Sequence, residues 1–438
     1  MGSLATRRVR ADQVTTPAGW TLPKSATAAE IVDGVIEEAL AWGTSDVHLE
    51  PNEHGMQVRI RVHGLLQNVL TIAAKDRAAV ISRIKILANL DISEHRLPQD
   101  GRIRIRNSGH AVDARVSTIP SLHGEKVVLR LLDLNGVAIP LDRIGLRERY
   151  LAQIRRLIRR PQGIILVTGP TGSGKTSTIY ACLKEIKSEA INIITIEDPI
   201  EYEISGVTQI AVHDKIGLTF EHCLRSVLRQ DPDVILVGEI RDRETARIAM
   251  QASLTGHLVF ATLHTNDAVG AITRLLDMEI PPYMIGSSLS GVLAQRLVQM
   301  LCPECKVAAK ADAELRGVLD PARSRLYQRG PGCDRCHRLG AVGRMGVFEL
   351  VTVTAALRAL IINRASEAEM REAAHSAEFP SMFQDGLRKV ADGQVAYDEL
   401  MRVAEPDRPG DDGPSPDAAP DARTPPPTSL KLVPLPRA

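Results

Sequence analysis

The clearest chemical pattern in this chain lies between Gly163 and Thr176, where the sequence reads GIILVTGPTGSGKT. Its second half fits G-x-x-x-x-G-K-[ST] at every specified position. Glycines let several backbone N–H groups converge on phosphate oxygens, the lysine can reach the β- and γ-phosphates, and the threonine hydroxyl can ligate Mg²⁺. The stretch therefore predicts a nucleoside triphosphate site made by Gly169, Pro170, Thr171, Gly172, Ser173, Gly174, Lys175 and Thr176, with Thr176 on Mg²⁺.

The flanking residues favour a phosphate site over a glycine-rich turn that matches by chance. Residues 164–168 form a short apolar run rich in β-branched residues, which is typical of a strand buried on both faces of a parallel sheet. Residues 177–186 can continue the loop as a helix, which would aim its positive N-terminus at the phosphates. A strand before the loop and a helix after it are the context that this pattern requires.

Acidic side chains follow two further apolar runs. Residues 192–203 read NIITIEDPIEYE, and residues 230–242 read QDPDVILVGEIRD. Ligands bind at the carboxyl ends of parallel strands, so a carboxylate there can orient the attacking water or hold magnesium through water. Gly238 stands where many P-loop enzymes have an aspartate, which leaves Glu239 at the end of its run. We expect Glu201 or Glu239 to orient the water, the alternative for each being a solvated acidic residue.

A fourth run, residues 255–266, reads TGHLVFATLHTN and has a histidine on each side of its apolar centre. His264 follows the expected strand, and a histidine in that place can sense the γ-phosphate. His257 is the weaker candidate. The alternative for both is a histidine that only makes a hydrogen bond.

Four of the six cysteines form two C-x-x-C pairs. Four thiolates can hold one tetrahedral Zn²⁺, and a structural site needs no open coordination position. A redox C-x-x-C is the alternative, but two copies without a thioredoxin-like context disfavour it. We therefore predict a structural Zn²⁺ bound by Cys302, Cys305, Cys333 and Cys336.

Length and charge limit the function classes. The 438 residues suffice for two or three domains, and 54 basic residues nearly balance 53 acidic ones. The chain therefore has no global basic field, and its charge does not indicate nucleic acid as a partner. No apolar run approaches the roughly 18–20 residues of a membrane span, and the first residues lack the apolar centre of a signal peptide. We expect a cytoplasmic protein with no transmembrane segment.

The expected elements divide the chain into domains. Residues 28–132 combine amphipathic helices with short alternating strands, which predicts an α+β domain. Residues 147–301 alternate strand and helix around the phosphate loop, which predicts a parallel sheet with helices on both faces. The remaining expected parts are a flexible N-terminus (1–27), a linker (133–146), a zinc-binding insert (302–340), a C-terminal helical part (341–404) and a disordered, proline-rich tail (405–438).

These motifs resemble those of the secretion-ATPase superfamily, and within it the type II secretion and type IV pilus-assembly ATPases. The resemblance spans about residues 28–403 and also covers SDVHLEP at 45–51, RLPQDGR at 96–102, RVSTIPSLHGEKVVLRLL at 115–132 and LAQRLVQMLCPEC at 293–305. It implies an α/β fold with a RecA-like P-loop ATPase domain built on a parallel sheet. A PAS-like α+β domain would precede it, with a small zinc-binding insert and C-terminal helices after it.

The resemblance also implies a function. Such proteins are hexameric ATPases that use ATP and Mg²⁺ to drive pilin or pseudopilin assembly, or secretion, at an inner-membrane platform with cytoplasmic docking proteins. Arginines of their N-terminal domain meet the nucleotide, and Arg102 and Arg115 occupy the matching motifs here. Retraction ATPases of the superfamily lack the four-cysteine insert, so its presence favours assembly or secretion. We expect a homohexamer, associated peripherally with the inner membrane through partners.

Two other classes stay open. A RecA-like nucleic-acid translocase is disfavoured by the balanced charge and by the absence of a basic strip with interleaved aromatic residues. A scaffold that binds ATP only to order an assembly is disfavoured by the intact Lys175, Thr176 and Glu239. Family members often carry a further N-terminal domain that docks on a membrane partner, whereas about 27 residues precede the first expected helix here.

Overall fold

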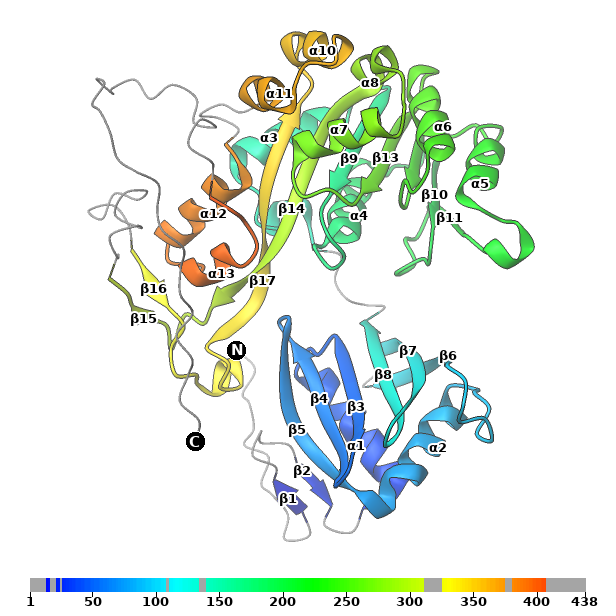
Figure 1. Ribbon diagram of the computed structural model, residues 1–438, viewed down its shortest axis with the longest axis vertical. Helices are drawn as coiled ribbons and strands as arrows, with labels where there is room; N and C mark the ends of the chain where they lie inside the picture. Colours follow the sequence, from blue (N-terminus) through cyan, green and yellow to red (C-terminus); the bar gives the residue numbers. More distant parts are fainter. Residues whose placement is uncertain are drawn as a thin grey trace.

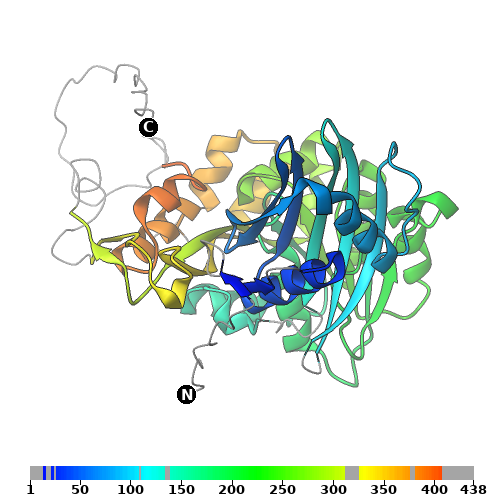
Figure 2. The ribbon, with the colours of Figure 1, turned by 90° about the horizontal axis from the view of Figure 1, so that it is seen from below.

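The computed structural model describes residues 13–15, 21–23, 26–107, 110–133, 139–310, 325–374 and 380–406. The expected proline-rich tail beyond residue 406 and most of the expected flexible N-terminus lie outside these residues. Strands β1 (Gln13–Thr15) and β2 (Thr21–Pro23) pair antiparallel where the sequence predicts irregular chain. Figures 1 and 2 show an N-terminal domain beside a larger domain, which we call the loop domain because it carries the phosphate loop.

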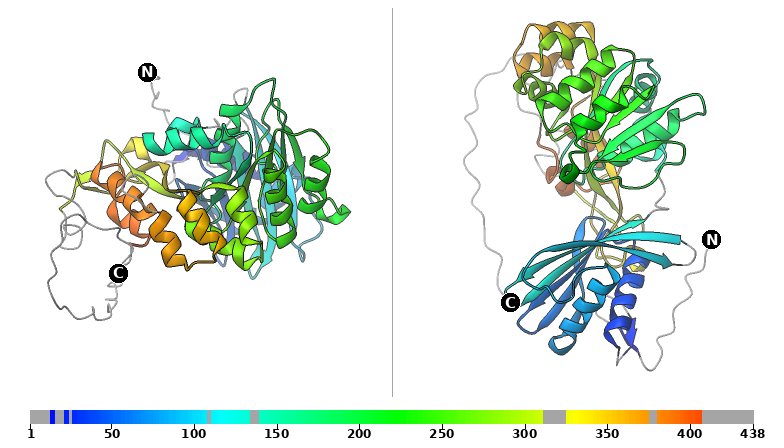
Figure 3. Two further views of the ribbon diagram at one scale, coloured as in Figure 1. Left: turned by 90° about the horizontal axis from the view of Figure 1, so that it is seen from above. Right: turned by 90° about the vertical axis from the view of Figure 1, so that its right-hand side faces the viewer.

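The N-terminal domain is built on an antiparallel sheet in the order β5-β4-β3-β8-β7-β6. Alternate residues of a strand face opposite sides, so Met56, Val58 and Ile60 are buried while Gln57 and Arg59 are partly exposed. Helices α1 and α2 cover one face of this sheet (Figure 3). The elements are α1 (Ala28–Ala41), β3 (Asp46–Asn52), β4 (Gly55–Val62), β5 (Leu65–Ala73), the 3₁₀ turn η1 (Ala74–Asp76), α2 (Arg77–Leu87), β6 (Gln99–Asn107), β7 (His110–Ser121) and β8 (Gly124–Asp133).

Local signals in the sequence explain where these elements begin and turn. Thr27 caps α1 in a capping box with Glu30, which satisfies two backbone N–H groups at the start of the helix. The expected turn between β4 and β5 is formed by His63 and Gly64, with φ angles of 50° and 89°. Positive φ at both positions matches the twist of a two-residue hairpin, and glycine adopts it without strain.

The loop domain is built on a sheet in the order β11-β10-β12-β13-β9-β14-β17. Pairs from β11 to β14 are parallel, as expected, and β17 pairs antiparallel with β14. All residues of the strand that precedes the phosphate loop are buried, as in a sheet covered on both faces. The strands are β9 (Gly163–Thr168), β10 (Ile193–Glu197), β11 (Thr208–Ala211), β12 (Val234–Val237), β13 (Leu258–Leu263), β14 (Leu289–Leu301) and β17 (Ala341–Thr352).

Helices cover both faces of this sheet. Ile164 and Leu166 of β9 belong to the apolar core that contains α5 to α8, whereas Ile165 and Val167 belong to the core that contains α3 and α4. The elements are η2 (Leu141–Arg143), α3 (Glu148–Leu157), α4 (Lys175–Ile186), η3 (Asp214–Ile216), α5 (Phe220–Val227), α6 (Arg243–Leu254), α7 (Ala268–Asp277) and α8 (Pro282–Ser288).

Strands β14 and β17 form a long two-stranded ribbon that extends beyond the other strands of the sheet (Figure 1). Cys302 directly follows β14, and Cys336 lies shortly before β17, so the ribbon brings the two C-x-x-C pairs together. The segment expected to be helical from residue 341 onward therefore begins with a strand. The remaining elements are β15 (Val307–Ala308), β16 (Tyr327–Gln328), η4 (Asp334–Cys336), α10 (Ala355–Ile362), α11 (Glu367–Ala374), α12 (Met382–Ala391) and α13 (Tyr397–Met401).

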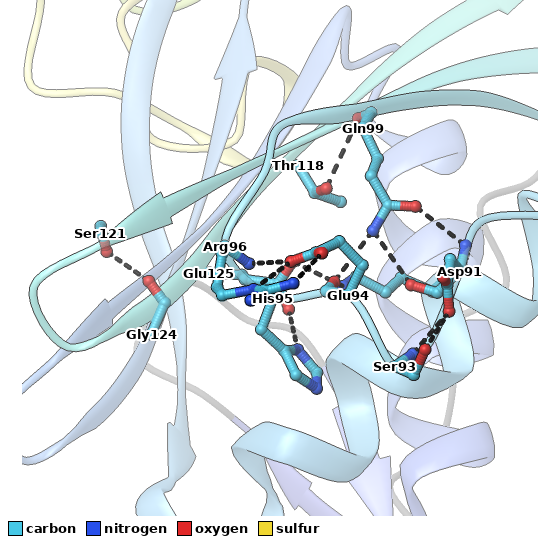
Figure 4. A network of polar contacts seen from close by, with 11 residues as sticks. Asp91, Ser93, Glu94, His95, Arg96, Gln99, Thr118, Ser121, Gly124 and Glu125 are labelled. Atoms are coloured by element: carbon cyan, nitrogen blue, oxygen red, sulfur yellow. Dashed lines mark hydrogen bonds and ion pairs between the residues drawn. The ribbon is translucent and has the colours of Figure 1, made fainter.

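A buried ion pair fixes the segment that joins α2 to β6 (Figure 4). Lys85 is fully buried, and its Nζ lies 2.6 Å from Glu125 Oε1 and donates to the backbone carbonyl of Glu94 at 2.6 Å. His95 Nδ1 lies 2.7 Å from the other oxygen of Glu125. Gln99, the first residue of β6, donates to the carbonyls of Asp91 and Glu94. The network therefore fixes the segment that leads from α2 to β6, the strand that carries Arg102.

The buried pair predicts a large stability effect. Lys85→Ala should lower the free energy of unfolding of the N-terminal domain by about 3–5 kcal/mol, because it leaves the buried Glu125 carboxylate without its buried cation. Arg83→Ala on the same helix is the control: Arg83 is partly exposed and pairs at 3.8 Å with the exposed Asp33, so its effect should stay below about 1 kcal/mol. Urea titration measures both, and equal losses would contradict the account.

Candidate nucleotide site and cysteine module

The predicted phosphate-binding residues lie together between the end of β9 and the first turn of α4. Gly172 and Gly174 have φ angles of 79° and 87°, a region in which a side chain is strained. Close packing also requires glycine: a Cβ on Gly174 would lie 2.8 Å from Gln295 Nε2, and one on Gly169 would lie 2.4 Å from the Gln295 carbonyl oxygen. The loop is therefore a tight backbone turn ahead of a helix N-terminus, the geometry that suits an anion.

Lys175 opens α4, and its side chain folds over the loop. Its Nζ donates to the carbonyls of Gly169 at 2.7 Å and Pro170 at 3.2 Å. Burial lowers the pKa of Lys175, the nearby Glu239 carboxylate opposes that shift, and the Arg296 guanidinium adds to it. Two cations thus border one loop, and a bound anion would relieve their repulsion.

Gln295 and Arg296 hold this arrangement from β14. The buried Gln295 side chain donates through Nε2 to the Ser173 carbonyl at 2.7 Å and accepts from Thr178 Oγ1 at 2.7 Å, so it ties the loop to α4. Arg296 Nη2 donates to Asn266 Oδ1 at 3.1 Å. The sequence assigns no role to either residue, because their position beside the loop follows from the pairing of β14 with β9.

Glu239 and His264 lie together at the carboxyl ends of β12 and β13. His264 Nε2 is 3.5 Å from Glu239 Oε2, and Arg241 pairs with Glu239 and, at 3.2 Å, with Asp198. His257 lies at the opposite end of β13, where its Nδ1 contacts the Ala252 carbonyl at 2.8 Å. The structure therefore groups Glu239 and His264 near Lys175 and leaves His257 away from them.

The acidic residues after β10 differ in environment. Glu197 is buried, its Oε1 accepts from Thr195 at 2.6 Å and Gln209 at 3.2 Å, and Tyr180 donates to its Oε2. Burial and this hydrogen bond raise the pKa of Tyr180. Glu197 therefore anchors β10 within the domain. Glu201 is only partly buried and lies on the segment that faces the N-terminal domain.

Three arginines form a cross-strand row on the N-terminal domain, which we call the arginine row. Strand register places Arg102 of β6 opposite Arg115 of β7, and Arg115 opposite Arg130 of β8. All three line a cavity of about 510 Å³ together with Asp100 and Pro199. Like charges directly opposite one another destabilise a sheet, so the arginine row is suited to an anionic ligand.

The arginine row already contacts the loop domain. Arg115 Nη2 donates to the Ile200 carbonyl at 3.0 Å, and its buried Nε has no hydrogen-bond partner among the described residues. Arg130 is held by Asp46, with Nε and Oδ1 2.9 Å apart. Sequence reasoning singled out Arg102 and Arg115 and missed Arg130, because only the register of β7 with β8 shows that Arg130 lies in line with them.

A second cavity, of about 260 Å³, lies beside the phosphate loop and between the two domains. Its lining comes from the loop and α4, from the N-terminal domain, from the segment that joins the domains and from β17. The residues include Gly174, Ser177, Thr178, Ser45, His63, Arg143, Ile144, Gln295, Arg344 and Met345. The cavity is thus continuous with the start of α4.

The four predicted zinc ligands converge. Their sulfur atoms all lie within 4.8 Å of one another, with Cys302–Cys333 at 3.7 Å and Cys305–Cys336 at 3.8 Å. Sulfur ligands about 2.3 Å from a tetrahedral Zn²⁺ lie roughly 3.8 Å apart, so the cluster fits that ion. Burial raises the pKa of the Cys336 thiol. Hydrogen bonds from the backbone N–H groups of Cys333 and Gly340 oppose this effect and help lower that pKa to about 7. We call residues 302–310 and 325–340 the cysteine module.

A glycine loop between a buried parallel strand and a helix, beside a second domain with an arginine row, defines a P-loop protein with the fold of the secretion ATPases. The chain belongs to the Type II/IV secretion system protein family, whose model matches residues 22–402. The expected α/β fold with a parallel sheet is thereby confirmed.

Individual relatives agree with this family. The chain is 51% identical over 376 residues to the Type II secretion system ATPase E of Vibrio cholerae, covering 85% of this chain and 75% of that protein. It is equally similar to the Type II secretion system protein E of Pseudomonas aeruginosa, covering 85% and 74%. Among solved structures, the ADP-bound pilus retraction motor PilT superposes with a TM-score of 0.59 at 28% identity, covering 88% and 98%. The Legionella pneumophila ATPase DotB superposes at 0.65 with 20% identity, which shows the fold alone.

The position of Gln295 predicts a defect in nucleotide binding. Gln295→Met keeps the side chain's length but removes both hydrogen bonds to the loop and α4, and each group left unsatisfied costs about 1–3 kcal/mol. We expect affinity for an ATP analogue, measured by calorimetric titration, to fall at least about tenfold. Gln251→Met on the exposed face of α6 is the control and should leave affinity unchanged. Unchanged affinity in Gln295→Met would show that the loop needs no support from β14.

The sulfur geometry predicts one zinc ion per chain. Protein purified under reducing conditions should contain about one equivalent of Zn²⁺ by elemental analysis, and Cys333→Ser should lose most of it, because a thiolate ligand is removed. Cys223→Ser, a change at a buried cysteine outside the cluster, should retain the ion. Wild-type protein without zinc would contradict the assignment.

Proposed function

We propose that the protein is the ATPase of a type II secretion machine, and that it hydrolyses ATP at a site shared by its two domains. One set of contacts carries the proposal. Arg115 of the arginine row donates to the carbonyl of Ile200. Two residues before Ile200, Asp198 pairs with Arg241, which also pairs with Glu239, the carboxylate near Lys175. The family and the printed names of the Vibrio and Pseudomonas relatives support type II secretion.

The chain's own groups take distinct roles in this proposal. Loop N–H groups and Lys175 bind the β- and γ-phosphates, and Arg296 adds positive charge beside them. Mg²⁺, held through the Thr176 hydroxyl, would neutralise phosphate charge when bound. Glu239 orients the attacking water, because it lies near Lys175 and its other partners, Arg241 and His264, hold its carboxylate at the strand end. Glu201 remains the second candidate for this role.

The cavity beside α4 suits the rest of the nucleotide. Phosphates on the loop would leave the ribose and base next to Ser177 and Thr178, which line that cavity. Residues of both domains and of the segment between them complete the lining, so a bound base would contact each part. Nucleotide occupancy would then favour one relative position of the domains.

The arginine row supplies the link between chemistry and motion. Arg115 reaches the loop domain at Ile200, and a further approach of the N-terminal domain would bring Arg102 and Arg115 onto the γ-phosphate. Arginine charge supplied by a moving element stabilises the transition state of phosphoryl transfer. Hydrolysis would thus require closure of the domains, and phosphate release would permit opening.

The proposal extends to a wider assembly, as the family suggests. A homohexamer at the cytoplasmic face of the inner membrane, bound to platform and docking proteins, would convert closure of each subunit into addition of pseudopilin-like subunits. No helix in the described part of the chain has the length and apolar composition that a membrane crossing requires.

Loss of the loop lysine should separate hydrolysis from folding. Lys175→Ala should reduce phosphate release to background while the unfolding transition stays in place, because Lys175 binds phosphate and fills no apolar core. Lys184→Ala, on the exposed face of the same helix, should retain wild-type turnover. Steady-state phosphate release by purified protein makes the comparison, and turnover by Lys175→Ala would refute the proposed site.

Loss of an arginine from the arginine row should lower the rate of ATP hydrolysis more than the affinity for ATP. Arg102→Ala and Arg115→Ala should lower turnover at least about tenfold with little change in ATP affinity, since an arginine finger is worth about 10³–10⁵ in rate. Lysine at either position should restore little of the lost turnover, because lysine lacks the planar guanidinium that can donate two hydrogen bonds to one phosphate. Arg104→Ala, at an exposed arginine of the same strand, is the control. Wild-type turnover in both Arg102→Ala and Arg115→Ala would show that the N-terminal domain is not part of the active site.

A further inference from the structure

The cysteine module contacts the N-terminal domain directly. The imidazole of His337 stacks on the indole of Trp42, with ring centroids 4.2 Å apart and an interplanar angle of 17°. Trp42 caps the C-terminus of α1. Leu339 packs against the apolar core of the N-terminal domain, to which Trp42 also belongs. Two of the three residues that follow the proposed zinc ligand Cys336 therefore make apolar contact with the other domain.

Backbone and sulfur atoms of the cysteines hold the conformation of these contact residues. His337 and Arg338 have φ angles of 50° and 63°, a left-handed conformation that costs roughly 1–2 kcal/mol for residues other than glycine. Hydrogen bonds within the module hold them there: Arg338 N to the Cys333 carbonyl at 2.9 Å, Leu339 N to the Cys336 carbonyl at 2.9 Å, and Gly340 N to Cys336 Sγ at 3.2 Å. All three acceptors belong to Cys333 or Cys336, so the turn depends on where these two cysteines are held.

A second contact joins the same surfaces. Gln299 of β14 donates through Nε2 to the carbonyl of His63 at 2.8 Å, in the turn between β4 and β5. Arg329 of the cysteine module donates to the amide oxygen Oε1 of the same Gln299 side chain. The module thus reaches the N-terminal domain at α1 directly and at the β4–β5 turn through Gln299.

We propose that the cysteine module is the docking site for the N-terminal domain of the same chain, and that Zn²⁺ holds this interface together by fixing the turn that carries His337 and Leu339. The inference rests on the proposed zinc site and is independent of ATP hydrolysis. An ion that did not set the position of His337 would leave Trp42 unaffected, because Trp42 is a residue of the other domain. The environment of Trp42 therefore separates the two roles.

The test uses full-length Trp20→Phe protein, in which Trp42 is the remaining tryptophan. Without nucleotide, the acrylamide quenching constant of Trp42 is compared before and after a chelator removes the zinc, and again after Zn²⁺ alone is returned. We expect removal to raise the constant at least about twofold, because the stacked ring no longer covers the indole, and Zn²⁺ to restore it. An unchanged constant after verified loss of zinc would overturn the proposal, as would protein that contains no zinc and takes none up.

A variant that retains zinc gives an independent measurement. His337→Asn removes the stacked ring, while asparagine tolerates the left-handed conformation. It should keep one zinc ion and show the higher quenching constant. Arg335→Ala is the control, because Arg335 pairs with Glu304 inside the module and should leave both zinc and quenching unchanged. Normal quenching in His337→Asn would refute the docking role. A quenching response in protein without phosphate release would refute the proposed ATPase function alone.

Discussion

The pairing of β14 with β9 is the constraint on which the rest of the site depends. β9 leads into the phosphate loop, and the register that places Ala294 opposite Thr168 brings Gln295 and Arg296 against the loop glycines. The same strand continues to Cys302, and β17 returns from the cysteine module to the sheet. The phosphate loop, the cysteine module and, through that module, the N-terminal domain are therefore attached to one ribbon.

The proposed function has an electrostatic reason for involving two domains. Lys175 and Arg296 border the loop, and the arginine row lies on the other domain, so each domain carries a cluster of positive charge. Such charge is unfavourable in a closed protein unless an anion lies between. In the proposed function a bound nucleoside triphosphate would supply that anion, and its hydrolysis products would no longer hold the negative charge in one place. Domain closure would then depend on the state of the phosphates.

The sequence predicts elements whose signals are local and misses relationships that depend on strand register. The phosphate loop and the four cysteines are dense motifs, and the His63–Gly64 turn lies between clearly alternating strands. By contrast, LSGVLAQRLVQML at 289–301 is apolar at positions that suit a helix or a buried strand, so no strand is predicted there. Gln295 and Arg130 gain their positions only through the pairing of strands distant in sequence. His337 gains its contact only when the two domains meet.

The most direct measurement is a structure of the protein with Mg²⁺ and a non-hydrolysable ATP analogue. The account predicts phosphates on the backbone amides of residues 169–176, with Lys175 released from the carbonyls of Gly169 and Pro170. It also predicts that the N-terminal domain of the same chain moves until Arg115 leaves the Ile200 carbonyl and binds the γ-phosphate. A fully bound analogue with Arg102 and Arg115 still turned away from the γ-phosphate would contradict the claim that the two domains share one active site.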